Sequence, residues 1–267
     1  MSVWHTVAFT HCGRVRAANE DGVAIEGRIL IGDMAAPTTL TVTKDICVLI
    51  IADGMGGHAH GAMASRALLE RLIADIERLA SPTTCAEAIQ AANDHLYELM
   101  HADPKAIGMG ATLVGATLTS TQLLIFNAGD SRGYLHSRDH LIQLSRDDVP
   151  DIRIDRSGRR LSHAVTQAVG GSTFHAPIEP HVSVEPPLLP GETLLLCSDG
   201  LTDMVPDQII QDVIRQATDI ESAARSLVAH AFRSGGTDNL SLVLAQRVPS
   251  NPPTRPTDRK SKEQGTA

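Results

Sequence analysis

Several short, unbroken apolar runs along the chain end at an acidic residue. In Val42–Ala52, β-branched and aliphatic residues continue up to Asp53. An apolar run of this length without alternation predicts a strand that is buried on both faces. The segments Thr193–Cys197 and Leu240–Arg247 predict further strands, and the first of them ends just before Asp199. Buried strands that finish near carboxylates are therefore a main pattern of this sequence.

Other segments carry apolar residues at helical spacing or as paired short runs. Helices are predicted over Ala62–Leu79, Glu87–Met100, Pro206–Gln216 and Glu221–Arg233. Further strands are predicted over Thr112–Leu118, Leu123–Ala128 and Gly133–His136, whereas Ser145–Arg160 is polar and irregular. Strands and helices are both abundant but do not alternate as regular βαβ units. The pattern therefore disfavours a doubly wound parallel sheet.

Composition limits the classes of protein to which the chain can belong. A length of 267 residues favours one large domain, and 42% hydrophobic residues suffice for a sizeable, mainly aliphatic core. The net charge of −8 argues against electrostatic binding to nucleic acid or to a membrane surface. Neither a bilayer-spanning run nor a signal peptide is recognisable.

Cysteine usage and the end of the chain add two expectations. The cysteines Cys12, Cys47, Cys85 and Cys197 are scattered without a CxxC pair, which favours a reducing, cytoplasmic setting. After about Val248 the chain is rich in Pro, Ser, Lys and Thr. Residues 249–267 are therefore predicted to be a disordered polar tail.

The stretch "VLIIADGMGGHAHGAMAS" allows three interpretations. The first is a dinucleotide-binding loop, because Gly54-x-Gly56-x-x-Ala59 satisfies the permissive form of that fingerprint. That fold needs a second parallel strand after the helix, whereas a further helix is predicted here. Asp53 would also place a carboxylate against the pyrophosphate. Both points count against this interpretation.

The second interpretation is a metal site built on His58 and His60. In hydrolases of that kind the motif usually continues to an acid two residues later, and that position is Ala62 here. The chain has 12 histidines, so two close together are unsurprising. The third interpretation makes Asp53 itself a metal ligand.

The rest of the chain supports the carboxylate interpretation. Acids stand beside glycine or asparagine near the ends of apolar strands at Asp53-Gly54, Gly129-Asp130, Asp199-Gly200 and Asp238-Asn239, and Glu20-Asp21 is a further acidic pair. Each dipeptide alone is an ordinary turn signal. Their recurrence instead predicts a shared cluster of oxygen ligands, which hard cations such as Mg²⁺ or Mn²⁺ prefer. Two such ions can activate water for attack on phosphorus.

These motifs resemble the bacterial metal-dependent serine/threonine protein phosphatases of type 2C. From about Gly13 to Gln246 they follow the family's order: "GRVRAANEDG", "IADGMGGHAHGAMAS", "GATLVGATL", "FNAGDSRGYL", "LSHAVTQAVGG", "LLLCSDGLTDMV" and "GGTDNLSLVLAQ". The resemblance implies an α+β fold, a four-layer αββα sandwich with two central, mainly antiparallel sheets flanked by helices. It also implies a catalytic domain over residues 1–248.

The resemblance assigns roles to individual residues. Asp53 matches the aspartate that bridges two catalytic metals, and the Gly54 carbonyl would bind the second. The remaining metal positions are Asp199 and Asp238 on the first ion, Glu20 and Asp21 beside the second through bound water, and Asp130 and Asp203 at a third, weaker site. Arg16 matches the arginine that holds the substrate phosphate. His58 matches a histidine that protonates the leaving alkoxide.

The implied activity is hydrolysis of phosphoserine or phosphothreonine by direct attack of a metal-bridging water. Two Mn²⁺ or Mg²⁺ ions are expected, with a third as an addition. A non-catalytic phosphoprotein-binding module and a small-molecule phosphomonoesterase stay open as alternatives, although acids at every metal position disfavour the former. A cysteine-nucleophile phosphatase is disfavoured because the required arginine, six residues after Cys12, falls at Ala18. Cys12 is instead expected to be a packing residue.

Two departures from the family pattern occur after "LIQLS". The family usually has an Asp-His pair there, whereas this chain has Arg146-Asp147-Asp148. The flap that follows, to Leu161, is short and carries Arg153, Arg156, Arg159 and Arg160. These arginines belong either to a solvated loop or to a surface that selects the phosphoprotein.

The expected partners are phosphorylated serine/threonine proteins and a bacterial serine/threonine kinase that the enzyme would oppose. Control of a type VI secretion system is one such setting, by analogy alone. A cytoplasmic monomer is expected.

Overall fold

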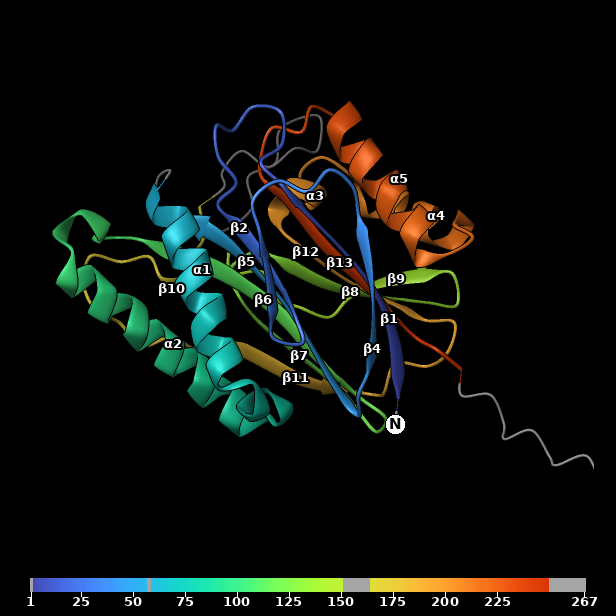
Figure 1. Ribbon diagram of the computed structural model, residues 1–267, viewed down its shortest axis with the longest axis horizontal. Coiled ribbons are helices and arrows are strands. Elements are labelled where there is room, and N and C mark those ends of the chain that lie inside the picture. The colour runs from blue at the N-terminus through green and yellow to red at the C-terminus, as the bar shows by residue number, and fades with distance from the viewer. Residues whose placement is uncertain (1, 57–58, 151–163, 250–267) are drawn as a thin grey trace, which may run out of the picture.

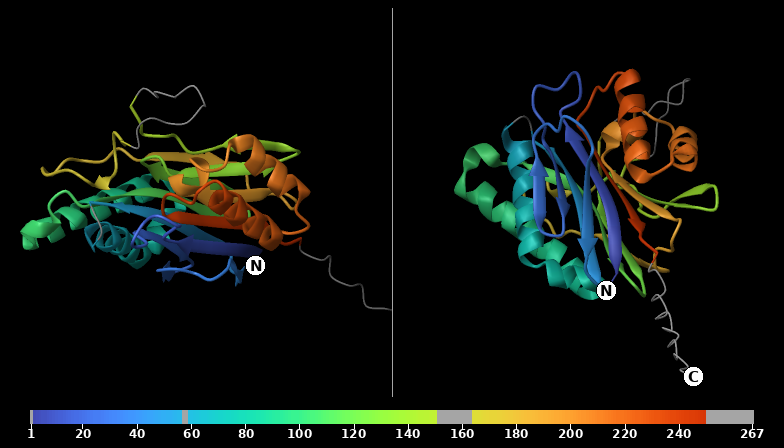
Figure 2. Two further views of the ribbon diagram at one scale, coloured as in Figure 1. Left: turned by 90° about the horizontal axis from the view of Figure 1, so that it is seen from above. Right: turned by 45° about the vertical axis from the view of Figure 1, so that its right-hand side comes forward.

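Two β-sheets lie face to face between two layers of helices in the computed structural model, which describes residues 2–56, 59–150 and 164–249 (Figures 1 and 2). All strand pairs within these residues are antiparallel. This arrangement confirms the expected four-layer αββα sandwich. In the described part of the chain, no helix combines the length and apolar character that crossing a membrane requires.

The first sheet has six strands and the second has seven. In spatial order the first contains β4 (Thr38–Thr43), β1 (Val3–His11), β13 (Leu240–Arg247), β12 (Thr193–Cys197), β8 (Arg132–Ser137) and β9 (His140–Gln143). The second contains β11 (His181–Glu185), β7 (Leu123–Ala128), β6 (Gly110–Thr119), β5 (Ile46–Met55), β2 (Asp21–Ile25) and β3 (Arg28–Ile31), and β10 (Val169–Gly170) pairs with β6.

Each sheet is covered on its outer face by a pair of helices. The second sheet carries α1 (Ala59–Ala74) and α2 (Pro82–Ala102), and the first carries α4 (Asp207–Gln216) and α5 (Ile220–Arg233) (Figure 1). Shorter helical turns are α3 (Asp199–Thr202), η1 (Ile76–Ala80) and η2 (Pro104–Ala106). One hydrophobic core lies under each helix pair, and a third lies between the sheets.

Strand β5 shows why the apolar runs are unbroken. Alternate side chains enter two different cores: Val48, Ile50 and Ala52 face the α1/α2 layer, whereas Cys47, Leu49 and Ile51 face the other sheet. Successive residues of a strand point to opposite faces, so a strand covered on both sides needs apolar residues at every position. The prediction of doubly buried strands is therefore confirmed.

Most predicted elements are present, with shifted ends. Strands β7, β12 and β13 have the predicted bounds. The predicted strand Val42–Ala52 is wrong at its start, because Lys44-Asp45 separates β4 from β5. The predicted helix Ala62–Leu79 is in fact α1 followed by the 3₁₀ helix η1. The predicted polar tail lies almost wholly outside the described residues.

Candidate active site

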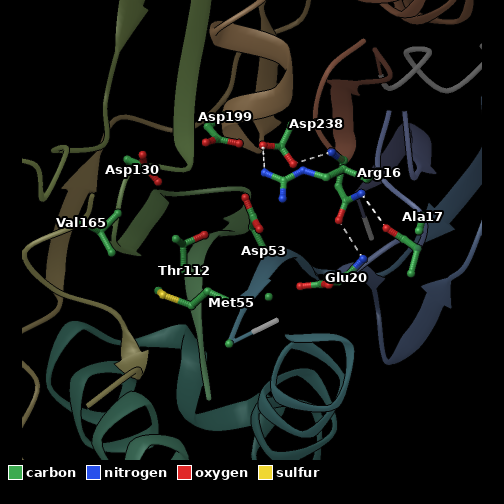
Figure 3. Close-up of a pocket in the computed structure, with 14 residues that line it drawn as sticks. Arg16, Ala17, Glu20, Asp53, Met55, Thr112, Asp130, Val165, Asp199 and Asp238 are labelled. Carbon is green, nitrogen blue, oxygen red and sulfur yellow. Dashed lines mark hydrogen bonds and ion pairs between the residues drawn. The ribbon is translucent and has the colours of Figure 1, made fainter. Parts of the chain in front are cut away.

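A pocket of about 280 Å³ opens at one end of the sandwich, and residues from both sheets line it (Figure 3). Its lining includes the carboxylates Glu20, Asp53, Asp130, Asp199 and Asp238. Arg16, Gly54, Thr112 and Asn239 also line it. The acids beside glycine and asparagine that the sequence singled out therefore do meet in space.

Antiparallel topology brings these acids together. Asp53 lies near the end of β5, and its Cα partner across the sheet is Asp21, the first residue of β2. Asp130 follows the end of β7, Asp199 follows β12, and Asp238 precedes β13. In an antiparallel sheet, the end of one strand lies beside the start of its neighbour. The ends of β5, β7 and β12 and the starts of β2 and β13 thus converge on one pocket.

The pair Asp21–Asp53 concentrates negative charge in a buried place. Asp21 is 2% exposed; its Oδ2 accepts a hydrogen bond from Ser198 Oγ at 2.9 Å. Its Oδ1 has no hydrogen-bond partner among the described residues. Burial raises the pKa of Asp21 to about 7. Burial, and then the neighbouring carboxylate of Asp21, raise the pKa of Asp53 well above its ordinary value.

This arrangement fits hard divalent cations. Buried carboxylates are normally paired or coordinate a metal, because an isolated buried charge is costly. Here one oxygen of the buried Asp21 has no partner among residues 2–56, 59–150 and 164–249, and the side chains on the pocket wall present several carboxylates. An all-oxygen ligand set of this kind suits Mg²⁺ or Mn²⁺.

Arg16 stands at the rim of this acidic pocket. Its Nη2 donates a hydrogen bond to Asp238 Oδ2 at 2.6 Å, and that bond holds the pKa of the guanidinium above its ordinary value. The Arg16 side chain is 58% exposed. A guanidinium carries five N–H donors, so the remaining donors are available to an anion that enters the pocket.

Asn239 fixes the loop that carries Arg16, and the sequence analysis treated this residue only as part of a turn dipeptide. Its Nδ2 donates to Ala18 O at 2.9 Å and to Cys12 O at 3.1 Å, while its Oδ1 accepts from Glu20 N at 2.8 Å. One amide thus holds both ends of the loop against the segment that contains Asp238. No sequence pattern reveals this role, because the bonded positions are over 200 residues apart.

The segment that departs from the family pattern has defined contacts. Asp147 Oδ2 accepts a hydrogen bond from Arg132 Nη2 at 2.7 Å, and both side chains are largely buried. This ion pair joins the start of β8 to the chain that follows β9. Asp147 is therefore a structural residue.

Asp148 supports the strand end that leads to Asp130. Its Oδ2 accepts from Gly129 N at 2.9 Å, and its Oδ1 lies 2.8 Å from His181 Nε2. Gln167 Nε2 donates to the same carboxylate at 3.0 Å. Asp148 is therefore a largely buried anchor that ties the pocket wall at Gly129-Asp130 to β11 and to the chain that contains Gln167.

Two predicted site residues, Asp21 and Asp203, are not among the residues that line the pocket. Asp21 lies behind it, buried against Ser198. Asp203 caps α3, where its N–H donates to Asp199 O at 2.8 Å. His58 and the flap arginines Arg153, Arg156, Arg159 and Arg160 lie outside the described residues.

Comparison with known proteins finds one matching family and close relatives within it. The family model described as protein phosphatase 2C matches residues 7–240. The serine/threonine phosphatase stp of Listeria innocua is 30% identical over 263 residues, covering 91% of this chain and 96% of that protein.

Solved structures share the fold. The catalytic domain of the serine threonine protein phosphatase PstP in complex with two manganese ions has a TM-score of 0.73 at 29% identity, covering 93% of this chain and 100% of that one. PppA, described as a key regulatory component of T6SS in Pseudomonas aeruginosa, has a TM-score of 0.70 at 25% identity, with 93% and 100% covered.

The stability of the metal-free protein is expected to fall as pH rises. Folding raises the pKa of Asp21 from 3.8 to about 7, so the folded state holds this proton more tightly than the unfolded chain. That contribution is complete below about pH 4 and is lost as pH rises through about 7. Added Mn²⁺ is expected to bind the deprotonated carboxylates, so its stabilising effect should grow over the same pH range. Thermal unfolding with chelator and with Mn²⁺ measures both trends.

Two variants separate the titration of Asp21 from a general effect of pH on stability. Asp21→Asn removes the buried charge. In chelator, the stability of this variant should therefore fall less with rising pH than that of the wild type. Asp139→Asn, in the exposed turn between β8 and β9, should keep the wild-type decline. An unchanged decline in Asp21→Asn would contradict the assignment of this trend to Asp21.

Proposed function

The chain belongs to the protein phosphatase 2C family and is a metal-dependent protein serine/threonine phosphatase, and we propose that the acidic pocket is its active site. Its cofactor is a pair of Mn²⁺ or Mg²⁺ ions, and its substrates are phosphorylated proteins. The observation that carries the proposal is the convergence of carboxylates from both sheets on one pocket. It is supported by the Oδ1 of Asp21, which has no hydrogen-bond partner in the described part of the chain. The proposed catalytic domain is residues 1–248.

The metal-binding roles divide among the acids. Asp53 would contribute to both ions and the Gly54 carbonyl to the second, Asp199 and Asp238 would complete the first, and Glu20 with Asp21 would stand beside the second. Gly54 suits this place because a Cβ there would overlap Gly61 O and Glu20 O. Asp130 lines the same pocket and, with Asp203, would serve a third ion.

The chemistry is direct hydrolysis of a phosphate monoester. When bound, the two cations supply a deprotonated water as nucleophile and offset charge on the phosphate oxygens. The residues of the chain position the substrate: the Arg16 guanidinium at the rim holds phosphate oxygens with its free donors. We assign protonation of the leaving serine or threonine oxygen to His58, because an imidazole titrates near neutral pH.

A serine/threonine kinase of the same cell is the proposed counterpart, in a circuit that includes type VI secretion as one setting. The support is the likeness to PppA, together with four free thiols, which suit a reducing cytoplasm. The enzyme should remove phosphate from the autophosphorylated kinase or from its substrates, as measured by loss of radiolabel. Label that persists while a phosphopeptide is hydrolysed would count against this pairing.

Hydrolysis of a phosphothreonine peptide should require metal and Asp199. Activity is expected with Mn²⁺ or Mg²⁺ and should vanish with chelator. Asp199→Asn removes a charged metal ligand and should lower kcat/KM by at least about 100-fold. The matched control, Asp139→Asn in the β8–β9 turn, should stay near wild type. Activity that is indifferent to chelator and to Asp199→Asn would show that the pocket is not the active site.

Arg16→Ala should separate phosphate binding from metal binding. Losing a charged hydrogen bond should raise KM for the phosphopeptide about 10-fold or more. The Mn²⁺ concentration for half-maximal activity should not rise, because Arg16 competes with cations for Asp238. Arg14→Ala, in the same loop but with its guanidinium over the Phe232 ring, is the control. Equal losses in both variants would contradict a specific role for Arg16.

A further inference from the structure

A second cluster of metal-ligating side chains lies at the end of β1, outside the lining of the acidic pocket. It consists of His11, Cys12 and Asp33, whose ligand atoms all lie within 4.8 Å of one another. Cys12 Sγ is 3.8 Å from His11 Nδ1 and 3.3 Å from Asp33 Oδ2. His11 and Cys12 are half-buried and Asp33 is exposed, so an ion from solvent can reach all three.

The spacing of these atoms matches a tetrahedral zinc site. With Zn–S near 2.3 Å and Zn–N or Zn–O near 2.1 Å, two ligands of one tetrahedral ion lie about 3.6 Å apart. The two distances from Cys12 Sγ fall on either side of that value. Three protein ligands would leave one position for water.

Neighbouring groups hold the three side chains in this arrangement. Asp33 Oδ1 accepts a hydrogen bond from Cys12 N at 2.8 Å, which leaves Oδ2 directed at the thiol. The His11 ring is parallel to Phe9, with centroids 6.1 Å apart, and Phe232 meets it edge-on at 5.3 Å. His11 Nδ1 accepts from Gly13 N at 3.0 Å, so it carries a lone pair and not a proton.

We propose that His11, Cys12 and Asp33 form a second, separate cation site that takes a thiophilic divalent ion such as Zn²⁺, and that its occupation lowers the phosphatase activity. Nitrogen and thiolate ligands favour Zn²⁺ over Mg²⁺, whereas the all-oxygen pocket favours the hard ions. The binding half of the proposal stands on this cluster alone, and the inhibitory half rests on the proposed function.

Gly13 links the cluster to the pocket. An ion on His11 Nδ1 takes the lone pair that Gly13 N now uses, so that hydrogen bond must break. Gly13 has a φ of +81°, and a Cβ there would overlap Asp238 O, so its backbone fits closely against the pocket wall. Arg14 N donates to Gly236 O at 2.7 Å along the same contact. A shift at Gly13 therefore reaches Arg16, two residues beyond Arg14, and its partner Asp238.

The binding half is tested with Co²⁺, which gives a thiolate-to-metal charge-transfer band only when bound to sulfur. The protein is loaded with excess Mg²⁺ and kept reduced by a phosphine. One equivalent of Co²⁺ should produce the band, and Zn²⁺ should abolish it. Cys12→Ser should lack the band, since Cys47, Cys85 and Cys197 are 0% exposed. Absence of the band in wild type, or its presence in Cys12→Ser, would overturn the site.

The inhibitory half is tested by phosphopeptide hydrolysis in saturating Mg²⁺ with buffered Zn²⁺. Each protein is compared with its own rate without Zn²⁺. Wild type should be inhibited at a Zn²⁺ concentration about 10-fold or more below that needed for Cys12→Ser or Asp33→Asn. His101→Ala, an exposed histidine at the end of α2, should match wild type.

Two results would distinguish failure of the inhibitory half from failure of the proposed function. Equal Zn²⁺ inhibition of wild type and Cys12→Ser would place the effect in the acidic pocket and overturn the inhibitory half. A protein that shows the Co²⁺ band but hydrolyses no phosphopeptide in Mn²⁺ or Mg²⁺ would overturn the proposed function and leave the second cation site supported.

Discussion

The repulsion among carboxylates at the end of the sandwich is the constraint on which this structure depends. Asp21 and Asp53 face each other across β2 and β5, and like charges directly opposite in a sheet are destabilising. Burial increases that cost, and the raised pKa values of both residues reflect it. A ligand that binds only the folded state adds stability by mass action. Metal ions bound by these carboxylates would therefore offset the destabilisation that their mutual repulsion causes.

The layers of the fold make this concentration of charge tolerable. Three hydrophobic cores, one under each helix pair and one between the sheets, bury nearly all of the central strands. Strands β5, β6, β12 and β13 run through two cores each, so their positions are fixed along most of their length. Asp53, Asp199 and Asp238 stand at or next to the ends of β5, β12 and β13. The rigid part of each of these three strands thus positions a carboxylate at its tip, as precise metal binding requires.

A feature could be predicted from the sequence where it depends on residues close together in the chain, and not where it depends on contacts between distant residues. Doubly covered strands such as β5 are recognisable because every position is apolar, whereas β1 escaped prediction because His5, Thr6 and Thr10 interrupt its apolar pattern. The acids were recognisable from their place beside glycine or asparagine near the ends of such strands. The anchors Asn239 and Asp148 were not, because their roles depend on contacts that only the folded chain creates. Cys12, expected to be a packing residue, instead lies against Asp33, 21 residues away.

The loop from Cys12 to Glu20 connects two kinds of ligand chemistry. On one side, Asn239 ties it to the segment that carries Asp238. On the other, Cys12 N and Gly13 N bond to Asp33 and His11. Arg16 lies between these anchors and contacts the acidic pocket through Asp238. Both anchors thus act on one short stretch of backbone that carries this guanidinium. In the proposed active site, the packing of this loop would therefore help to position Arg16 for phosphate binding, together with Asp238.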